Sequence, residues 1–414
     1  GVTTAFIGND GGGDADVGAV LGSARSRPVG INYAAYIGFG EVRSAVVGEA
    51  DRKPTPDELT RMRTMVAAAM CQGALGLSTG LFYAPQSFAA PDEVVALARE
   101  AATRGGVYDS HIRDESSYSI GLAAAVDEAI AVGREARLPV NISHIKALGV
   151  DVHGQAPAII AKVEAARAAG QRVTADQYPW SASGTTLAAA LVPRWAHDGG
   201  RDALLRRFAD AAVADRLRGD MALNLRRRGG AESLLITEGE YRGQRLSEIA
   251  RTLALDPVAA AMAVVRIGDP RVASFNQTEE DIAAFMRRPW VMTGSDASVG
   301  HPRAYGSFAR KYDEYVRKRK VLSLREFIER SSALAADSFR IADRGRLRPG
   351  AFADIVLFDP ASFAARATYA EPTLLATGVR LVLVNGVPAV EEGRVTGAAA
   401  GRGLPQTPPA GSCR

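Results

Sequence analysis

Cysteine is nearly absent from this chain of 414 residues, which contains only two. Cys71 and Cys413 stand 342 positions apart, so the sequence offers no disulfide framework and no pair of cysteines spaced to ligate zinc. A metal ion would have to be held by histidine and carboxylate side chains. We expect Cys71, which falls between a predicted helix and a predicted strand, to pack in the core.

Long apolar runs and an excess of one charge are also missing. No segment approaches the roughly 18 to 20 apolar residues of a membrane-spanning helix, which argues against an integral membrane protein. Fifty lysines and arginines against 46 acidic residues leave a net charge of only +4, unlike the strongly basic surface of a nucleic-acid-binding protein. With 47% hydrophobic and 23% charged residues, the chain has the composition of a folded globular protein.

The first eight residues include neither an initiator methionine nor a basic segment, and their β-branched and apolar side chains are typical of a strand. We therefore expect the natural N-terminus to lie before Gly1, together with any export signal that it carried. The sequence favours a cytoplasmic protein and leaves a periplasmic or secreted one open.

Short apolar segments alternate with alanine-rich amphipathic helices between residues 60 and 180. The predicted strands cover residues 73–77, 106–108, 140–142 and 173–175, and the predicted helices cover residues 93–102, 122–132 and 158–169. The polar residues that follow the strands recur every 33 positions, about one strand–helix unit: Ser78, His111, His144 and Gln177. This regularity predicts an α/β protein with a (β/α)₈ barrel whose C-terminal rim carries these residues. A doubly wound sheet is the alternative.

The strand rhythm stops between residues 183 and 238, where an arginine-rich helical stretch predicts an insertion. This insertion is either a lid over the rim or a pair of solvated helices. We expect residues 272–275 and 289–294 to be the last two barrel strands, followed by a helix at 323–336. The barrel domain would span residues 1–340, followed by a small β-sandwich domain at 341–400 and a loose tail at 401–414.

Two of the five histidines stand where a barrel enzyme places its chemistry. His111 and His144 follow neighbouring predicted strands, so their imidazoles are expected to converge on one metal ion. Asp296 follows the last predicted strand, where a carboxylate can ligate a metal ion and exchange a proton with water. Asp10 follows the first strand in a glycine-rich loop. Each residue alone has a structural alternative, such as a helix cap for Asp296, but the histidine pair in phase with an aspartate favours a metal site.

Several motifs occur in order along the chain: GALGLSTGLFYAP at 73–85, SHIRDE at 110–115, SHIK at 143–146, ADQYP at 175–179, GSD at 294–296 and HPR at 301–303. They strongly resemble the D-aminoacylase branch of the amidohydrolase superfamily, whose members are N-acyl-D-amino-acid deacylases. Two later segments, LRPGAFAD at 347–354 and VNG at 384–386, resemble the small β-sandwich of the superfamily. The resemblance covers nearly the whole chain.

The resemblance implies roles for individual residues. His111 and His144 match the two strand-end histidines that ligate the tightly bound zinc, and Asp296 matches the catalytic aspartate. Four residues match positions that line the acyl and carboxylate ends of the substrate: Tyr83, Lys146, Tyr178 and Arg303. The implied cofactor is Zn²⁺, as one or two ions, with one favoured for this chain.

The sequence departs from the family pattern at two places. The motif Gly-Asn-Cys-Gly, whose cysteine ligates zinc, reads Gly-Asn-Asp-Gly at 8–11, so that Asp10 would supply a harder oxygen ligand. The His-x-His motif of the first barrel strand does not occur, so either the chain is a fragment or the protein has lost that strand. The expected metal ligands are thus Asp10, His111 and His144, with Asp296 nearby as a further ligand.

Residues and resemblance together predict a zinc-dependent amidohydrolase that cleaves N-acyl-D-amino acids, with Asp296 as general base and acid. A peptidase or amidase that acts on peptides containing D-residues, and a catalytically inactive barrel scaffold, are the alternatives. The expected partner is a small N-acyl amino acid or a short peptide, rather than nucleic acid or a membrane. The oligomeric state stays open.

Overall fold

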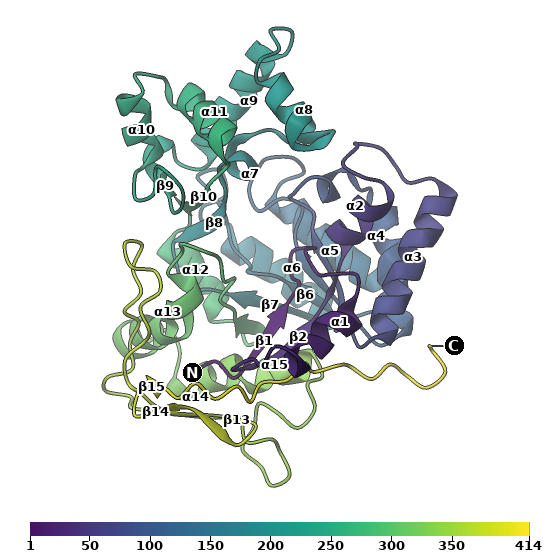
Figure 1. The fold of residues 1–414 in the computed structure, drawn as a ribbon, viewed down its shortest axis with the longest axis vertical. Helices are drawn as coiled ribbons and strands as arrows, with labels where there is room; N and C mark the ends of the chain where they lie inside the picture. The colour runs from purple at the N-terminus through teal and green to yellow at the C-terminus, as the bar shows by residue number, and fades with distance from the viewer. Residues whose placement is uncertain (414) are drawn as a thin grey trace.

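Parallel strands lie at the centre of the computed structural model, which describes residues 1–413 (Figure 1). The largest sheet has the order β11-β7-β6-β5-β4-β3, and all its neighbouring strands are parallel. These strands are β3 (Ile37–Gly38), β4 (Gly76–Gly80), β5 (Val107–His111), β6 (Val140–Ile142), β7 (Val173–Gln177) and β11 (Val291–Thr293). A parallel pair, β1 (Thr4–Ile7) and β2 (Asn32–Ala35), continues this arrangement, because Tyr36 N bonds to Ile7 O and Leu75 N bonds to Ala35 O.

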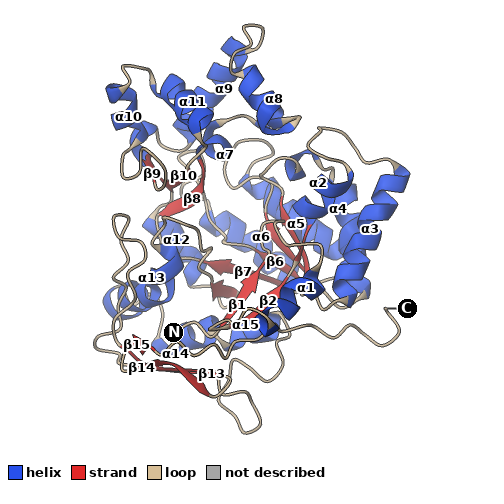
Figure 2. Cartoon of the chain, in the orientation of Figure 1, coloured by secondary structure: helices blue, strands red, loops and turns tan. Residues whose placement is uncertain are grey.

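Amphipathic helices connect the strands and cover the outer side of the sheet (Figure 2). They are α1 (Val17–Gly22), α2 (Phe39–Val46), α3 (Pro56–Cys71), α4 (Pro91–Thr103), α5 (Leu122–Ala136), α6 (Ala156–Ala168) and α12 (Glu279–Met286). Their inward side chains, such as Leu97, Val126 and Val163, are fully buried against the strands. The alternation of parallel strands and helices predicted between residues 60 and 180 is confirmed, because buried parallel strands and half-buried helices have distinct apolar patterns. β4 begins three residues later than predicted, so Ser78 lies within this strand and not after it. No helix within residues 1–413 is long and apolar enough to cross a membrane.

A lobe of helices, residues 182–275, projects from one end of the parallel sheet and is coloured teal and green in Figure 1. We call it the helical lobe. It contains β8 (Ala182–Thr186), α7 (Leu187–Leu191), α8 (Gly200–Arg207), α9 (Ala214–Arg227), β9 (Leu234–Ile236), α10 (Leu246–Thr252), α11 (Pro257–Ile267) and β10 (Arg271–Phe275). Its own apolar cluster includes Leu217, Met221 and Val265, all of them fully buried.

The prediction that residues 272–275 form a barrel strand was wrong. β10 pairs antiparallel with β8 and β9 in a separate sheet of three strands. A short apolar run is compatible with any buried strand, and its periodicity does not identify the partner strand.

The C-terminal part of the chain packs below the parallel strands. After β11 come α13 (Arg303–Arg310), the π-helical segment η5 (Lys311–Lys318), α14 (Leu324–Ser331) and α15 (Ala333–Ser338). A single antiparallel sheet follows, made of β12 (Ile355–Phe358), β13 (Val379–Val384), β14 (Val387–Glu391) and β15 (Arg394–Val395). The predicted turn at Asn385 and Gly386 joins β13 to β14, and both residues have positive φ, 51° and 83°, as a tight hairpin turn requires.

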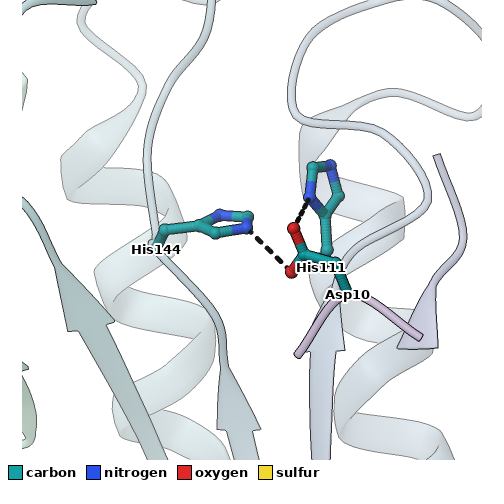
Figure 3. A group of neighbouring side chains, drawn as sticks. All are labelled: Asp10, His111 and His144. Atoms are coloured by element: carbon teal, nitrogen blue, oxygen red, sulfur yellow. Dashed lines mark hydrogen bonds and ion pairs between the residues drawn. The ribbon is translucent and has the colours of Figure 1, made fainter. Parts of the chain in front are cut away.

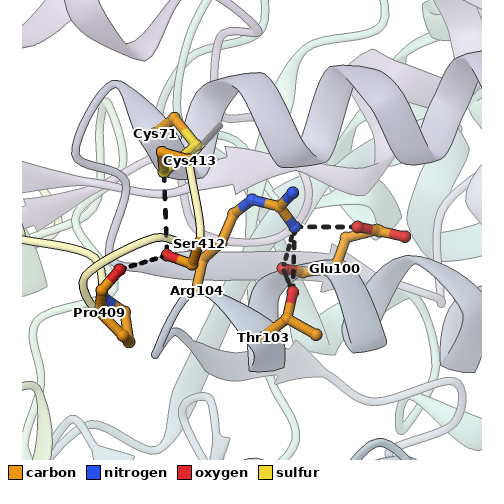
Figure 4. The surroundings of a disulfide bond; sticks show 7 residues. All are labelled: Cys71, Glu100, Thr103, Arg104, Pro409, Ser412 and Cys413. Carbon is orange, nitrogen blue, oxygen red and sulfur yellow. Dashed lines mark hydrogen bonds and ion pairs between the residues drawn. A yellow bond between two sulfur atoms is a disulfide. The ribbon is translucent and has the colours of Figure 1, made fainter.

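Cys71 and Cys413 form a disulfide bond, with their Cα atoms 5.6 Å apart (Figure 4). The expectations of unpaired cysteines and of a buried Cys71 were therefore wrong: Cys71 ends α3 at the surface. Backbone hydrogen bonds from Leu404 to Tyr33 and from Gln406 to Gly73 lead the tail back to this helix end. The tail is thus fixed where the sequence predicted a loose segment, because the spacing of two cysteines along the chain does not reveal how close they lie in space.

We expect reduction of this disulfide to lower the free energy of unfolding by about 2–4 kcal/mol, since it opens a loop that constrains the unfolded chain. Guanidinium unfolding followed by tryptophan fluorescence, with and without a reductant, measures the change. The variant Cys413→Ser should match the reduced protein and be insensitive to the reductant. An identical midpoint for oxidised and reduced protein would contradict this expectation.

Lys311 is a fully buried cation at the start of η5. Its Nζ donates to Thr293 Oγ1 at 2.9 Å, and no carboxylate within the described chain forms an ion pair with it. Burial lowers the pKa of Lys311 to about 7, and Arg330 adds to this effect, while Asp176 opposes it.

The stability of the protein should depend on pH through Lys311. An unfolded lysine titrates near pH 10.4, so between about pH 7 and 10 the unfolded chain binds more protons than the folded one. The contribution of Lys311 to stability therefore rises with pH, by up to about 1.4 kcal/mol per pH unit. Urea unfolding at about pH 7 and pH 9 should show that the wild type gains stability relative to Lys311→Met. A difference between the two proteins that does not change with pH would contradict this.

Candidate active site

The glycine-rich loop after β1 holds Asp10 over the C-terminal ends of the parallel strands. Ser78 of β4 fixes the loop, since its Oγ donates to Gly8 O at 2.5 Å and accepts from Gly11 N at 3.2 Å. Gln86 Nε2 donates to Asp10 O at 3.0 Å. Gly11 has a φ of +76°, and an added Cβ would lie 2.1 Å from Gln86 Oε1. Only glycine lets the loop pass this close to Gln86.

His111 and His144 come together because their strands are adjacent. His111 is the last residue of β5, and His144 stands two residues after β6, its parallel neighbour. The centroids of the two imidazole rings are 4.5 Å apart. The Asp10 carboxylate lies between them, with Oδ2 3.5 Å from His111 Nδ1 and Oδ1 3.3 Å from His144 Nε2 (Figure 3). Each of the three residues offers a ligand atom within 4.8 Å of the others.

Three residues of this region have the left-handed backbone conformation that side chains other than glycine rarely adopt. The φ angles are 57° at Asp10, 37° at His144 and 44° at Asp296. At His144 the buried Asp176 holds this conformation, because its Oδ1 accepts a hydrogen bond from His144 N at 3.1 Å. Such backbone conformations persist where the surrounding structure enforces them, and they concentrate at functional sites.

The environment of His111 fits a metal ligand. The residue is only 5% exposed, yet neither ring nitrogen makes a hydrogen bond within the described residues, and the 3.5 Å contact of Nδ1 with Asp10 Oδ2 is a long ion-pair distance. A buried polar nitrogen without a partner is costly, and a metal ion held between Asp10, His111 and His144 would satisfy it. Two imidazoles and a carboxylate are a ligand set that suits Zn²⁺ and leaves a coordination position open.

Glu115 belongs to the site, although no role was predicted for it from the sequence. Its Oε1 lies 3.1 Å from His144 Nδ1, and the same carboxylate forms an ion pair with Lys146, whose Nζ is 2.6 Å from that nitrogen. Glu115 and Lys146 thus occupy the Nδ1 side of the His144 ring, and Nε2 faces Asp10 Oδ1 on the other side, where a metal ion would bind. Burial raises the pKa of Glu115, but the charges of Lys146 and His111 outweigh it and hold the pKa below its usual value. The available signal was its position, four residues after His111 in the SHIRDE segment.

Asp296 reaches the same rim from the loop after β11. Its Oδ2 lies 2.6 Å from Nη1 of Arg303, which is 2% exposed and lies over the ring of Tyr178 at 4.8 Å from its centroid. The ring of Tyr83 contacts that of His111, with 4.9 Å between the centroids. Burial raises the pKa of both phenols, so Tyr83 and Tyr178 remain hydrogen-bond donors at neutral pH.

One cavity brings together nearly all the residues singled out from the sequence. Its lining includes Asp10, Tyr83, His111, His144, Lys146, Tyr178 and Asp296. Arg303 is not part of that lining and adjoins it through Asp296. Two other histidines make backbone hydrogen bonds outside the cluster: His153 contacts Asn276 O and His301 contacts Ala182 O, each at 3.1 Å. The helical lobe adds Ser183, Gly184, Thr185 and Arg228 to the wall.

Known proteins resemble this chain in both sequence and fold. A sequence profile described as the amidohydrolase family matches residues 24–390. An N-acyl-D-glutamate deacylase of Alcaligenes xylosoxydans xylosoxydans is 34% identical over 376 residues, which are 90% of this chain and 69% of that protein. A D-aminoacylase of the same organism is 31% identical over 402 residues, which are 94% of this chain and 73% of that protein.

A crystal structure of N-acyl-D-glutamate deacylase from Bordetella bronchiseptica has the same fold, with a TM-score of 0.82 and 31% sequence identity. The match covers 98% of this chain and 83% of that one. That crystal structure contains zinc and a phosphonate inhibitor that mimics the tetrahedral intermediate of its reaction.

We expect the purified protein to bind about one divalent metal ion per chain, and His144→Ala to lose most of it because a three-residue ligand set cannot spare an imidazole. Metal analysis by plasma mass spectrometry, after equilibration with zinc and removal of the excess, measures the stoichiometry. His153→Ala is the matched control, since His153 lies outside the cluster. Equal metal content in His144→Ala and wild type would rule out this ligand set.

Proposed function

The chain belongs to the D-aminoacylase branch of the amidohydrolase family, and from this premise we propose that it is a zinc-dependent hydrolase of N-acyl-D-amino acids. The reaction would cleave the amide bond and release a carboxylate and a free D-amino acid. The observation that carries this proposal is the convergence of Asp10, His111 and His144 on one point, with Asp296 in the same cavity. The substrate class comes from the relatives, which are named as deacylases of N-acyl-D-amino acids.

Asp10, His111 and His144 would hold the zinc ion, with Asp296 as a further oxygen donor beside them. When bound there, zinc polarises the scissile carbonyl and lowers the pKa of a water molecule. The carboxylate of Asp296 accepts a proton as water attacks the amide carbon. The same carboxylate then returns the proton to the nitrogen of the leaving amine, which prevents the amide bond from reforming.

Side chains around the cavity would orient the substrate. The planar guanidinium of Arg303 suits the α-carboxylate of an amino acid, which it can bind through two parallel hydrogen bonds. Lys146 Nζ and the hydroxyls of Tyr83 and Tyr178 are donors in the same cavity, suited to the charge that develops on the amide oxygen. Glu115 keeps Lys146 in place through their buried ion pair.

We assign the parallel strands to a (β/α)₈ barrel that is one strand short. The support is the parallel order β11-β7-β6-β5-β4-β3, the parallel pair β1-β2 beside it, and the gathering of polar residues at one end of these strands. The barrel domain would span residues 1–340, and the insertion predicted at 183–238 falls within the helical lobe. The antiparallel sheet β12–β15 would belong to a small β-sandwich domain at 341–400.

Replacing Asp296 by asparagine should lower the turnover of N-acetyl-D-methionine by about 10²- to 10⁴-fold, because the proton acceptor is lost while Asp10, His111 and His144 remain to hold the zinc ion. The assay measures release of free amine from both enantiomers, alongside metal analysis, and the L-enantiomer should not be hydrolysed. Asp337→Asn is a suitable control, since Asp337 pairs with Arg346 on the surface. A fully active Asp296→Asn protein would contradict the role of Asp296, and absence of turnover of every N-acetyl-D-amino acid by the metal-loaded wild type would contradict the proposed substrate class.

A further inference from the structure

Three consecutive arginines at the C-terminal end of α9 differ in their partners. Arg226 binds Asp151 through two contacts, Nη1 to Oδ1 at 2.8 Å and Nη2 to Oδ2 at 3.0 Å. Arg227 donates from Nε to Ser117 Oγ at 3.1 Å and lies 3.9 Å from Asp151 Oδ2. Arg228 has no carboxylate oxygen within 4.0 Å among residues 1–413.

Arg228 is nevertheless the most buried of the three, with 2% of its surface exposed. Its Nε donates to Ala190 O at 3.1 Å, and its guanidinium lies 5.6 Å from the centroid of the Tyr118 ring. Its Nη1 is buried and has no hydrogen-bond partner within the described residues. A buried charge without a counterion is expensive for a folded protein, so this arrangement indicates an anion that the protein binds.

The unpaired guanidinium belongs to the wall of the cavity that contains the metal cluster. The two other cations at or beside this cavity form ion pairs with carboxylates. Lys146 pairs with Glu115, and Arg303 pairs with Asp296. Arg228 is therefore the cation of this cavity lining that no carboxylate of the described residues contacts.

Backbone contacts fix the position of Arg228. The end of α9 rests on the loop that follows His144 and Lys146, because Val150 N donates to Arg227 O at 3.0 Å. Gly149 lies against the same carbonyl, and an added Cβ there would be 2.2 Å from Arg227 O. The guanidinium is thus held in a fixed place relative to the metal cluster, as a specificity residue requires.

Space for a longer substrate lies next to the metal cluster. Phe82 and Tyr83 line both the metal cavity and a second cavity of about 610 Å³, whose wall includes Tyr118 and Arg227. Arg228 lines the metal cavity, and its guanidinium lies 5.6 Å from the centroid of the Tyr118 ring, which belongs to the wall of the larger cavity.

We propose that Arg228 binds a carboxylate on the substrate side chain, so that the preferred substrates are N-acyl-D-amino acids with acidic side chains. This assignment rests on the proposed deacylase function and names its substrate class. Arg228 is a specificity residue and takes no part in bond cleavage.

The kinetic test compares N-acetyl-D-glutamate with N-acetyl-D-glutamine, which have nearly the same shape and differ in charge. The wild type should favour the glutamate derivative by at least about tenfold in kcat/KM, as expected for a site with a buried group that needs this partner. In Arg228→Gln this ratio should fall to about one, mainly through KM, and Arg228→Lys should keep part of the preference. Arg226→Gln is the matched control, because Arg226 pairs with Asp151 at the surface, and it should keep the wild-type ratio.

A binding measurement separates this inference from the proposed function. Calorimetric titration of zinc-loaded and zinc-free protein with D-glutamate and D-glutamine requires no turnover. The wild type should bind D-glutamate at least about tenfold more tightly than D-glutamine, and Arg228→Gln should not. Hydrolysis of N-acetyl-D-methionine without any preference for D-glutamate would overturn the role of Arg228 and leave the deacylase function standing. A D-glutamate preference that depends on Arg228, without hydrolysis of any N-acetyl-D-amino acid, would support the role of Arg228 and overturn the deacylase function.

Discussion

The parallel register of β5 and β6 is the constraint on which the site depends. It brings His111 and His144 to the same end of the sheet, with their ring centroids 4.5 Å apart. Asp10 arrives from a distant part of the sequence, and its loop is held by Ser78 and Gln86. The two strands therefore determine where the imidazole rings lie, and the glycine-rich loop determines where the carboxylate of Asp10 lies between them. If either were displaced, the three ligand atoms would no longer face one another.

Two buried ion pairs stabilise the charged side chains around the rest of the cavity. Glu115 compensates Lys146 beside the histidines, and Asp296 compensates Arg303 on the other side. Each pair keeps two charged groups out of water at a place where a substrate needs them, and removing one partner would leave the other uncompensated. The cost of placing charges in the interior is thus reduced for the residues to which we assign substrate binding and proton transfer.

The sequence was informative where a residue's role follows from its position on a strand. The recurrence at 33 residues predicted that His111 and His144 would stand together, and the helix and strand patterns between residues 60 and 180 were sufficient to predict the parallel sheet. The sequence was silent where a role depends on contacts between distant segments. Tertiary packing, which sequence spacing does not encode, produces three such features. They are the bond between Cys71 and Cys413, the pairing of β10 with β8, and the guanidinium of Arg228 that lacks a carboxylate partner. Glu115 is an intermediate case. The sequence motif that contains it was recognised, but its contact with His144 was not predicted.

The residues of the site come from two parts of the fold, and this division affects which substitutions can alter substrate preference. The metal cluster and Asp296 stand at the ends of the parallel strands, whereas Arg228 stands at the end of α9 in the helical lobe, which has an apolar cluster of its own. Substitution of a lobe side chain at the cavity, such as that of Arg228, would therefore alter the charge and shape presented to a substrate and leave the proposed metal ligands and Asp296 unchanged. Such an architecture is modular: during evolution or in the laboratory, new substrate preferences can arise on one segment while the reaction chemistry is inherited intact on the other.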